Sequence, residues 1–329
     1  MKILNAQETR QALPMRETIE AMKAAYAALS SGRAEIPLRT ALPVAPEEAT
    51  SLFMPAFVDN ADGDNALTIK IVHLFPKNPA RGLDFIQAAV MVFDAQSGKT
   101  LALLEGSTLT AIRTGAASGA ATDLLARPDS REAVIFGAGA QGRTQLEAVC
   151  AVREIETAWI VDTDPVRAQA FADEMSGRTP VPADIRIAPD PKTALANADI
   201  VCTATTSRQP VYAFADLRPG THVNGVGSYT LDMVENPPEL VVAASVFMDE
   251  HTAILAEAGE IVRAIRELGF DEKRMTELGQ VVLGKASGRR SSEEITFFKS
   301  VGVAVQDAMA AQLAMQNAAK FGLGTEVEF

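Results

Sequence analysis

The chain has 329 residues, of which 47% are hydrophobic and 22% are charged, and its formal net charge is −12. This length exceeds that of a typical single domain, so we expect two domains, each with a sizeable core. The acidic balance, with no basic run to offset it, excludes nucleic acid and anionic membranes as expected partners. We find neither an apolar stretch near the ~20 residues of a membrane span nor a signal-peptide pattern, so we expect a cytoplasmic protein.

The first third of the chain predicts one helix followed by a sheet. Residues 18–30 carry apolar side chains at helical spacing. Apolar segments with turn signals between them, such as those at 59–63 and 94–98, predict strands. These strands are expected at 37–44, 51–58, 65–75, 85–94 and 100–106. Because several are joined too tightly for helical crossovers, the sheet should be largely antiparallel.

The remainder of the chain predicts an α/β fold. An Ala/Gly-rich helix is expected at Leu109–Ala126, with Ser107 or Thr108 as its N-cap. After Arg131, strands alternate with helices, which predicts a doubly wound parallel sheet. Its strands are expected at 133–136, 158–162, 184–188, 199–203, 222–226 and 246–249. A long helix at Ser300–Lys320 is expected to return to the N-terminal domain.

The strongest local signal is the segment Glu132–Val149. The apolar run 133–136 predicts a buried strand and leads into a turn of the form GxGxxG, followed by apolar residues at helical spacing. Gly137 allows the tight turn, Gly139 lets backbone N–H groups approach a pyrophosphate, and Gly142 lets the helix pack close to the strand. Strand, turn and helix together predict a dinucleotide-binding site, with a purely structural turn as the alternative.

The identity of the dinucleotide is indicated by the next apolar run, Trp159–Val161. It ends at Asp162, about 20 residues after the last glycine of the turn, where a carboxylate binds the ribose hydroxyls of NAD. Asp162 would repel a 2′-phosphate, and Thr163 and Asp164 offer no cation to bind one. We therefore predict NAD rather than NADP as the cofactor.

Two cations conflict with their expected surroundings, and such conflicts often mark a site. Lys70 lies in the strand Ala66–Phe75, whose faces are both mainly apolar, so it should leave bulk water and need a partner. Arg113 lies in the first turns of a helix, where the dipole disfavours a cation. For each residue the alternative is a structural salt bridge. For Lys70 a further alternative is a side chain on an edge strand that extends its ammonium group to water. Arg39 could add a third cation, although alone it is typical of a surface arginine.

Other catalytic patterns are missing from the sequence. We find no Ser/His/Asp triad, Walker motif or metal site, and Cys150 and Cys202 lack CxxC spacing, so we expect buried, inert thiols. The glycine-containing segment 224–228 follows a predicted sheet strand, and loops at such strand ends face the ligand crevice. NAD combined with buried cations predicts a carboxylate-bearing substrate and hydride transfer.

Four segments resemble the ornithine cyclodeaminase/mu-crystallin family, and they follow one another in the family's order over nearly the full chain. The segments are Ile69–Gln87, Leu109–Arg127, Gly137–Val149 and Thr296–Ala311. The resemblance implies a Rossmann NAD-binding domain at 121–304. It also implies a second α+β domain, formed by residues 1–120 with 305–329, that binds substrate and forms a homodimer. Family members include cyclodeaminases, ketimine reductases, alanine dehydrogenases and NADPH-binding lens crystallins.

The resemblance also implies roles for individual residues. Arg39, Lys70 and Arg113 match the catalytic cations that hold the substrate carboxylate and the reacting group. Expected cofactor contacts are Thr114, Gly137, Gly139, Ala140, Gln141, Gly142, Asp162 and Thr203, with Val226 and Ser300 near the nicotinamide. The expected substrate pocket comprises Met54, Gln87, Tyr229 and Val301.

One departure from the family separates its activities. Cyclodeaminases carry Gly-Gly-Asp in the loop after the fifth Rossmann strand, and this Asp contacts the substrate amine. Aligned on Val226 and Glu235, Tyr229 stands at that position, and Asp232 aligns with a lysine instead. A tyrosine cannot replace a carboxylate that must hold an ammonium group. The departure favours reduction over cyclodeamination.

We therefore predict an NAD-dependent oxidoreductase that interconverts a small α-imino acid (ketimine) and its amino acid, mainly as an imine reductase. The first alternative is an ornithine or lysine cyclodeaminase, an ammonia-lyase with tightly bound NAD. An alanine-dehydrogenase-like enzyme and a non-enzymatic crystallin-like protein are the others. The expected partners are the small substrate and a second copy of the chain.

Overall fold

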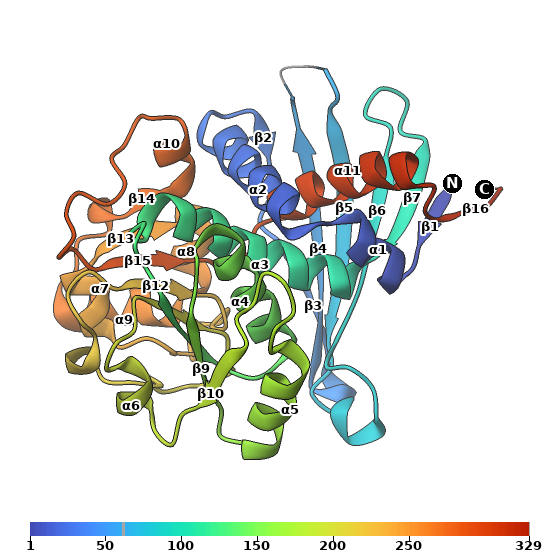
Figure 1. The fold of residues 1–329 in the computed structure, drawn as a ribbon. Coiled ribbons are helices and arrows are strands. Elements are labelled where there is room, and N and C mark those ends of the chain that lie inside the picture. The colour runs from blue at the N-terminus through green and yellow to red at the C-terminus, as the bar shows by residue number, and fades with distance from the viewer. Residues whose placement is uncertain (61–62, 329) are drawn as a thin grey trace. The chain divides into compact units, whose positions relative to one another are not determined.

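The computed structural model describes residues 1–60 and 63–328 and divides the chain into two compact units. The first unit comprises Met1–Arg113 and Val303–Phe329, and the second comprises Thr114–Gly302. Sequence placed these boundaries slightly later, at 120/121 and 304/305. Helix α3 (Gly106–Leu125) carries the chain from one unit into the next (Figure 1). Of the turn expected at 59–63, residues 61–62 lie outside the described residues.

The first unit is built on one mainly antiparallel sheet, in the order β16-β1-β7-β6-β5-β4-β2, with β3 paired to β4. Among the described strands of this sheet, β1 and β7 form the single parallel pair. The strands are β1 (Lys2–Leu4), β2 (Ala34–Glu35), β3 (Thr40–Val44), β4 (Ala49–Val58), β5 (Ala66–Leu74), β6 (Ile86–Phe93), β7 (Thr100–Glu105) and β16 (Thr325–Glu326). The antiparallel prediction is confirmed, and the short strands β1, β2 and β16 were not predicted.

One face of this sheet is covered by helices. Helix α11 (Ala304–Phe321) packs on β4, β5 and β6 and against α2 (Met15–Ser30), and α1 (Ala6–Ala12) lies beside it (Figure 1). Burial alternates along most of β5, where the side chains of Thr68, Lys70 and Val72 are buried on this covered face. The C-terminal helix therefore returns to the N-terminal residues, as expected.

The second unit contains a wholly parallel sheet in the order β10-β9-β8-β11-β12-β15-β13-β14. Its strands are β8 (Glu132–Phe136), β9 (Thr157–Val161), β10 (Asp184–Ile187), β11 (Ile200–Thr203), β12 (His222–Gly225), β13 (Ser245–Met248), β14 (Thr276–Glu277) and β15 (Thr296–Lys299). Its helices after α3 are α4 (Ala140–Val152), α5 (Pro165–Met175), α6 (Pro191–Leu195), α7 (Pro238–Ala243), α8 (His251–Glu257), α9 (Gly259–Leu268) and α10 (Leu278–Val282). The strand order reverses between β8 and β11, which is the position of the ligand crevice in Rossmann folds.

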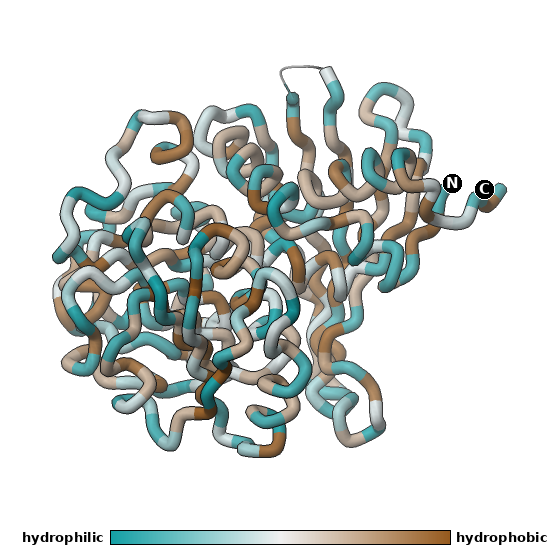
Figure 2. The backbone as a smooth tube through the Cα atoms, viewed as in Figure 1, coloured by the Kyte–Doolittle hydropathy of each residue, from teal (hydrophilic) through white to brown (hydrophobic). Residues whose placement is uncertain are grey.

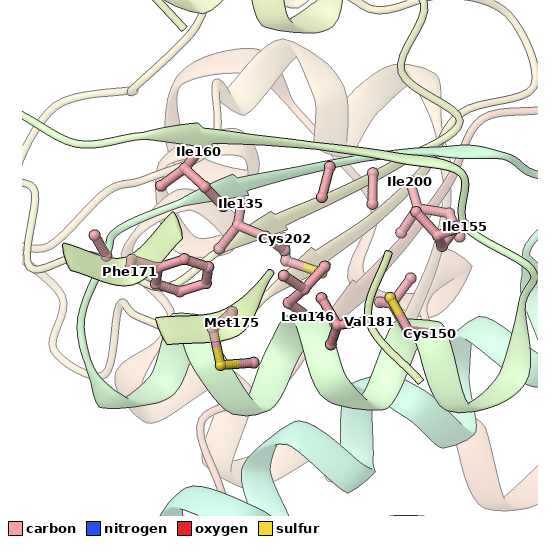
Figure 3. Packing of buried hydrophobic residues seen from close by; sticks show 14 of the residues in the cluster. Ile135, Leu146, Cys150, Ile155, Ile160, Phe171, Met175, Val181, Ile200 and Cys202 are labelled. Carbon is pink, nitrogen blue, oxygen red and sulfur yellow. The ribbon is translucent and has the colours of Figure 1, made fainter. Parts of the chain in front are cut away.

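The core of the second unit lies between the sheet and α4 and α5. Ile135 and Ile160 on the strands face Leu146 on α4 and Phe171 on α5 (Figure 3). Burial of such side chains contributes about 1.5–3 kcal/mol each. More generally, hydrophobic segments lie inside both units and many connecting loops are hydrophilic (Figure 2). No helix within the described residues is long and apolar enough to cross a membrane.

The start of α3 differs from the prediction. It begins at Gly106, and its first N–H groups, those of Ser107 and Thr108, donate to the Glu105 carboxylate at 2.7 and 2.8 Å. Assigning the N-cap to Ser107 or Thr108 was therefore wrong. A carboxylate is well placed at the positive end of a helix, and the Ser107 hydroxyl is used instead to accept from the N–H of Ala88.

The start of α11 also differs from the prediction. The helix begins at Ala304 rather than Ser300, because the buried Asp249 carboxylate accepts from the N–H groups of Val301 and Gly302. Gly302 has φ +79°, in the left-handed region that glycine adopts readily. These contacts hold the preceding residues in a loop that follows β15.

Candidate active site

The sheet of the second unit places most of the expected cofactor residues along one edge. Register aligns the last residues of four strands in one row, namely Phe136 (β8), Thr203 (β11), Gly225 (β12) and Lys299 (β15). Gly137, Val226 and Ser300, which follow these ends, therefore lie at the carboxyl edge, as does Asp162 after β9. The parallel register brings these residues together although they are far apart in the sequence.

The glycine turn has the geometry of a pyrophosphate site. Gly137 has φ +102°, and a Cβ there would lie 2.5 Å from the carbonyl oxygen of Ala204. A Cβ on Gly142 would lie 2.0 Å from the Gly137 oxygen, so neither position accepts another residue without a shift of the backbone. At Gly139, by contrast, the nearest atom to an added Cβ is Arg167 Nη2 at 3.6 Å. The turn is thus tight where the chain reverses and open where a ligand would approach.

The first turn of α4 offers polar groups to such a ligand. Gly139 is the N-cap and makes no side-chain capping hydrogen bond, so helix N–H groups point toward the turn. The amide Oε1 of Gln141, in the same turn as Ala140, is buried and has no hydrogen-bond partner within the described residues. The carbonyl of Thr114, on α3, accepts from Gln145 of α4 at 3.3 Å, which places Thr114 beside this helix.

Asp162 lies where a ribose would be bound. Its Oδ2 accepts from the N–H of Ala138 in the glycine turn at 2.7 Å, and its Oδ1 accepts from the N–H of Asp164 at 2.9 Å. The carboxylate is therefore held at the turn, where a carboxylate is expected to bind the ribose hydroxyls of NAD. Arg167, in the first turn of α5, is a neighbouring cation that the sequence interpretation missed. These residues fit a bound NAD.

In the first unit, Lys70 and Arg113 share a carboxylate that the sequence did not identify. Asp307, in the first turn of α11, lies 2.7 Å from Lys70 Nζ and 2.9 Å from Arg113 Nε, one oxygen for each cation. Arg113 Nη1 also donates to Gln306 Oε1 at 2.7 Å. The side chains of Lys70, Arg113 and Asp307 are 2%, 6% and 1% exposed, so water screens these charges little.

The proton affinity of Lys70 is tuned by these neighbours. Burial and, to a smaller extent, the positive charge of Arg113 together lower the pKa of Lys70 from 10.5 to about 7, against the opposing effect of Asp307. Arg39 also lowers the pKa of Lys70 through its charge, which places the half-buried Arg39 side chain near the cluster. A lysine with a pKa near neutrality can both hold and release a proton at physiological pH.

The remaining residues expected in the substrate pocket occupy different surroundings. Met54 on β4 pairs in register with Lys70 and is buried on the same face. Gln87 is exposed, and its register partner is His73, so it points to the sheet face opposite Lys70. Within this unit Gln87 is not brought to the cations. Tyr229 and Val301 belong to the second unit, in the loops after β12 and β15.

The loop after β12 rests on a buried ionic network that the sequence interpretation missed. Lys299 Nζ donates to the carbonyl oxygen of Ser228 at 2.8 Å and to its hydroxyl at 2.6 Å, and lies 3.3 Å from Glu260. The Ser228 N–H donates to Glu235 at 2.7 Å. Burial raises the pKa of Glu235 to about 7. The network fixes the backbone that precedes Tyr229.

Val226, Thr203 and Ser300 were expected near the cofactor, and all three make hydrogen bonds at this edge of the sheet. The N–H of Val226 donates to the Thr203 carbonyl at 3.0 Å, and the Thr203 hydroxyl accepts from Asn236 at 3.0 Å. The Ser300 hydroxyl donates to Asp249 at 2.8 Å. The expected residues here are thus ordered by internal hydrogen bonds.

The two cysteines lie where the sequence interpretation expected them, inside the protein. Cys150 and Cys202 are free and buried in the core of the second unit (Figure 3), and burial raises the pKa of each thiol to about 12. Burial of both thiols is therefore confirmed. Among the described residues, no group of three or more His, Cys, Asp or Glu side chains could hold a metal ion.

Comparison with known proteins adds relatives of known activity. Residues 1–321 match the model of the "Ornithine cyclodeaminase/mu-crystallin family". A Δ1-pyrroline-2-carboxylate reductase of Bacillus cereus is 39% identical over 331 residues, which cover 100% of both chains. The Thermococcus litoralis Δ1-pyrroline-2-carboxylate reductase, solved with NADH and L-proline, is 40% identical with a TM-score of 0.94, covering 99% of this chain and 100% of that one. An archaeal alanine dehydrogenase dimer with bound NAD is 28% identical with a TM-score of 0.91, covering 100% and 99%.

These matches extend over both units. The four-segment resemblance seen in the sequence is confirmed by them. The chain belongs to the ornithine cyclodeaminase/mu-crystallin family.

Proposed function

We propose that this chain is an NADH-dependent reductase of a small α-imino acid of the Δ1-pyrroline-2-carboxylate class, producing the corresponding amino acid. The observation that carries the proposal is the buried pair of cations, Lys70 and Arg113, around one carboxylate. This cluster occurs in a chain whose other unit fits NAD. The similar reductases from Bacillus cereus and Thermococcus litoralis support this choice of substrate class.

Each cation has a distinct task in this reaction. Arg113, assisted by Arg39, binds the substrate carboxylate through paired N–H donors, because a planar guanidinium matches a carboxylate. Lys70, in its ammonium form, donates a proton to the imine nitrogen. Bound NADH supplies the hydride that reduces the imine carbon, so the C=N bond becomes C–N with one hydride and one proton added and NAD⁺ remaining.

Cyclodeamination is the alternative that the loop after β12 argues against. Tyr229 stands where cyclodeaminases carry the acid that contacts the substrate amine. The nearest downstream acid, Asp232, is exposed and lies 3.2 Å from Arg208, with the Thr230 hydroxyl donating to it. It is engaged at the surface of the unit and does not replace the missing carboxylate.

The test compares reaction classes on one preparation. With Δ1-pyrroline-2-carboxylate or its six-membered homologue, the protein should oxidise NADH with one amino acid formed per NADH. Pyruvate with ammonia tests the alanine dehydrogenase alternative. Ornithine or lysine with NAD tests the lyase: ammonia release without net change in NADH would overturn the proposal.

We also propose a homodimer through the sheet face opposite α11. On this open face, β5 presents Ile69 and Ile71, and β4 presents Phe53 and Phe57, all half-buried and apolar. An apolar face of this kind is typical of an interface between chains. Dependence on NADH, a coenzyme that cells regenerate internally, supports a cytoplasmic location. Light scattering at micromolar concentration should give twice the chain mass, and a monomer would contradict the dimer.

A further inference from the structure

A single carboxylate organises both cations of the proposed substrate site. Asp307 uses Oδ1 for Arg113 Nε and Oδ2 for Lys70 Nζ, at 2.9 and 2.7 Å. It lies in the first turn of α11, where the helix dipole favours an acid, and it is fully buried. A buried carboxylate with two buried cations is costly to form unless each contact is well made. Oδ1 accepts a hydrogen bond from Arg113 Nε, whereas Oδ2 holds Lys70 at ion-pair distance and has no hydrogen bond of good geometry within the described residues.

The neighbouring residue in the sequence supports the same arrangement. Gln306 Oε1 accepts from Arg113 Nη1 at 2.7 Å and from the N–H of Val303 at 3.0 Å. Its Nε2 donates to the hydroxyl of Tyr26 on α2 at 2.5 Å. Gln306 and Tyr26 are fully buried as well. The first turn of α11 is therefore tied to α2, and Arg113 is held from two directions.

This arrangement sets the plane of the Arg113 guanidinium without using all of its N–H donors. A guanidinium has five N–H donors in a fixed fork. Within the part of the chain that the structure describes, the contacts to Asp307 and Gln306 use two of them, which leaves donors for a substrate carboxylate in a predetermined plane. Preorganisation of this kind lowers the cost of ordering side chains when a ligand binds.

The charge of Asp307 also acts on Lys70. Lys70 faces Arg113 and Arg39, which favour loss of its proton, and Asp307, which favours retention. Without this carboxylate, the ammonium form that must donate the proton would become rarer near neutral pH. With it, the cluster still has more cations than anions and so attracts one substrate carboxylate.

We propose that Asp307 is a positioning residue for imine reduction: it orients the Arg113 clamp and keeps Lys70 protonated for transfer to the imine nitrogen. Gln306 assists by fixing the opposite edge of the guanidinium. This inference rests on the proposed function, because it assigns roles within that reaction.

The test measures the pH dependence of kcat/KM for NADH-dependent reduction of Δ1-pyrroline-2-carboxylate. Asp307→Asn removes the negative charge at constant size. Activity should fall about 100-fold at neutral pH, and the basic limb of the profile should move to lower pH by at least about one unit. Gln306→Glu adds a negative charge beside Arg113 while the Tyr26 hydroxyl can reverse its hydrogen bond. Its basic limb should move to higher pH.

The controls separate positioning from general damage. Asp173→Asn, at an exposed position on α5, should leave the profile unchanged. The affinity for NADH, measured by fluorescence titration, should change less than about 2-fold in Asp307→Asn, since the residues expected to bind NADH do not include Asp307. If Asp307→Asn does not fold, the direction of the Gln306→Glu shift decides alone. Basic limbs at the parental pH in the folded variants would overturn the inference, whereas no NADH oxidation by the parent protein would instead refute the proposed function.

Discussion

Replacing Arg113 by alanine tests the carboxylate clamp and its electrostatic coupling together. The change deletes the contacts of Arg113 to Asp307 and Gln306 and removes the fork that would bind the substrate carboxylate. Losing charged hydrogen bonds to a buried carboxylate costs about 3 kcal/mol, so kcat/KM should fall about 100-fold or more. The loss should appear mainly in the kinetic parameters for the imine substrate, and the affinity for NADH should not change.

The same variant makes a second prediction with a defined sign. The positive charge of Arg113 lowers the pKa of Lys70, so its removal should raise that pKa from about 7. Lys70 would then stay protonated to higher pH, and the decline of residual activity above neutrality should begin later than in the parent. Arg113→Lys keeps a charge but lacks the planar fork, so it should restore little activity and leave the limb nearer its original position.

Steady-state kinetics from pH 5.5 to 9.5, with thermal unfolding as a check on folding, provide the assay. Breaking a buried ion pair destabilises a protein by about 3–5 kcal/mol, so a lower Tm is expected in the alanine variant. A folded Arg113→Ala protein whose kcat/KM stays within about 3-fold of the parent would refute the clamp.

Three further predictions concern the cofactor, the loop and the buried acid. NADH should bind at least ~10-fold tighter than NADPH, because one repelled phosphate is worth ~1.4 kcal/mol. Asp162→Ala should reduce this difference in affinity, whereas Arg167→Ala should weaken the binding of both dinucleotides equally if Arg167 contacts the pyrophosphate. Equal dissociation constants of the parent protein for NADH and NADPH would contradict the role of Asp162. Tyr229→Phe should lower the reductase activity only slightly. The Tyr229→Asp variant should not release ammonia from ornithine. If it does, this position alone decides between reduction and cyclodeamination. Burial raises the pKa of Glu235 from 4.5 to about 7, so the folded chain retains a proton that the unfolded chain releases between these values, and stability should fall by at most about 3 kcal/mol as pH rises through this window. Glu235→Gln should flatten the dependence of Tm on pH, and parallel curves for the two proteins would argue against the assignment.

The parts of the fold that the sequence predicted well are those with strong local patterns. The run before Gly137 and the run ending at Asp162 are apolar, short and bounded by turn residues, and both are strands of the parallel sheet. β15 was not predicted, although it lies between β12 and β13. Its four residues, Thr296–Lys299, end in a lysine whose burial depends on Glu260, far away in the sequence. No local pattern reveals such a partner.

The candidate site was also predicted only where the sequence carries a local signal. Lys70 and Arg113 were found because each conflicts with its local surroundings, and the resulting need for a partner was inferred. The partner itself, Asp307, was missed because an acid in the first turn of a helix is locally favourable and so attracts no notice. Glu235 and Glu260 were missed for a related reason: only the fold brings them to Ser228. Gln87 lies on the face of β6 opposite to that of Lys70, and its place in the substrate pocket stays a prediction.

Hydride transfer to the imine carbon is the central claim, and isotope transfer tests it most directly. The protein should be incubated with Δ1-pyrroline-2-carboxylate and NADH deuterated at the transferring position of nicotinamide C4, and the product analysed by mass spectrometry and NMR. We predict proline carrying one deuterium on its α-carbon, in amount equal to the NADH oxidised, with no ammonia released. Proline without deuterium, or ammonia formed from ornithine with no net oxidation of NADH, would contradict the account.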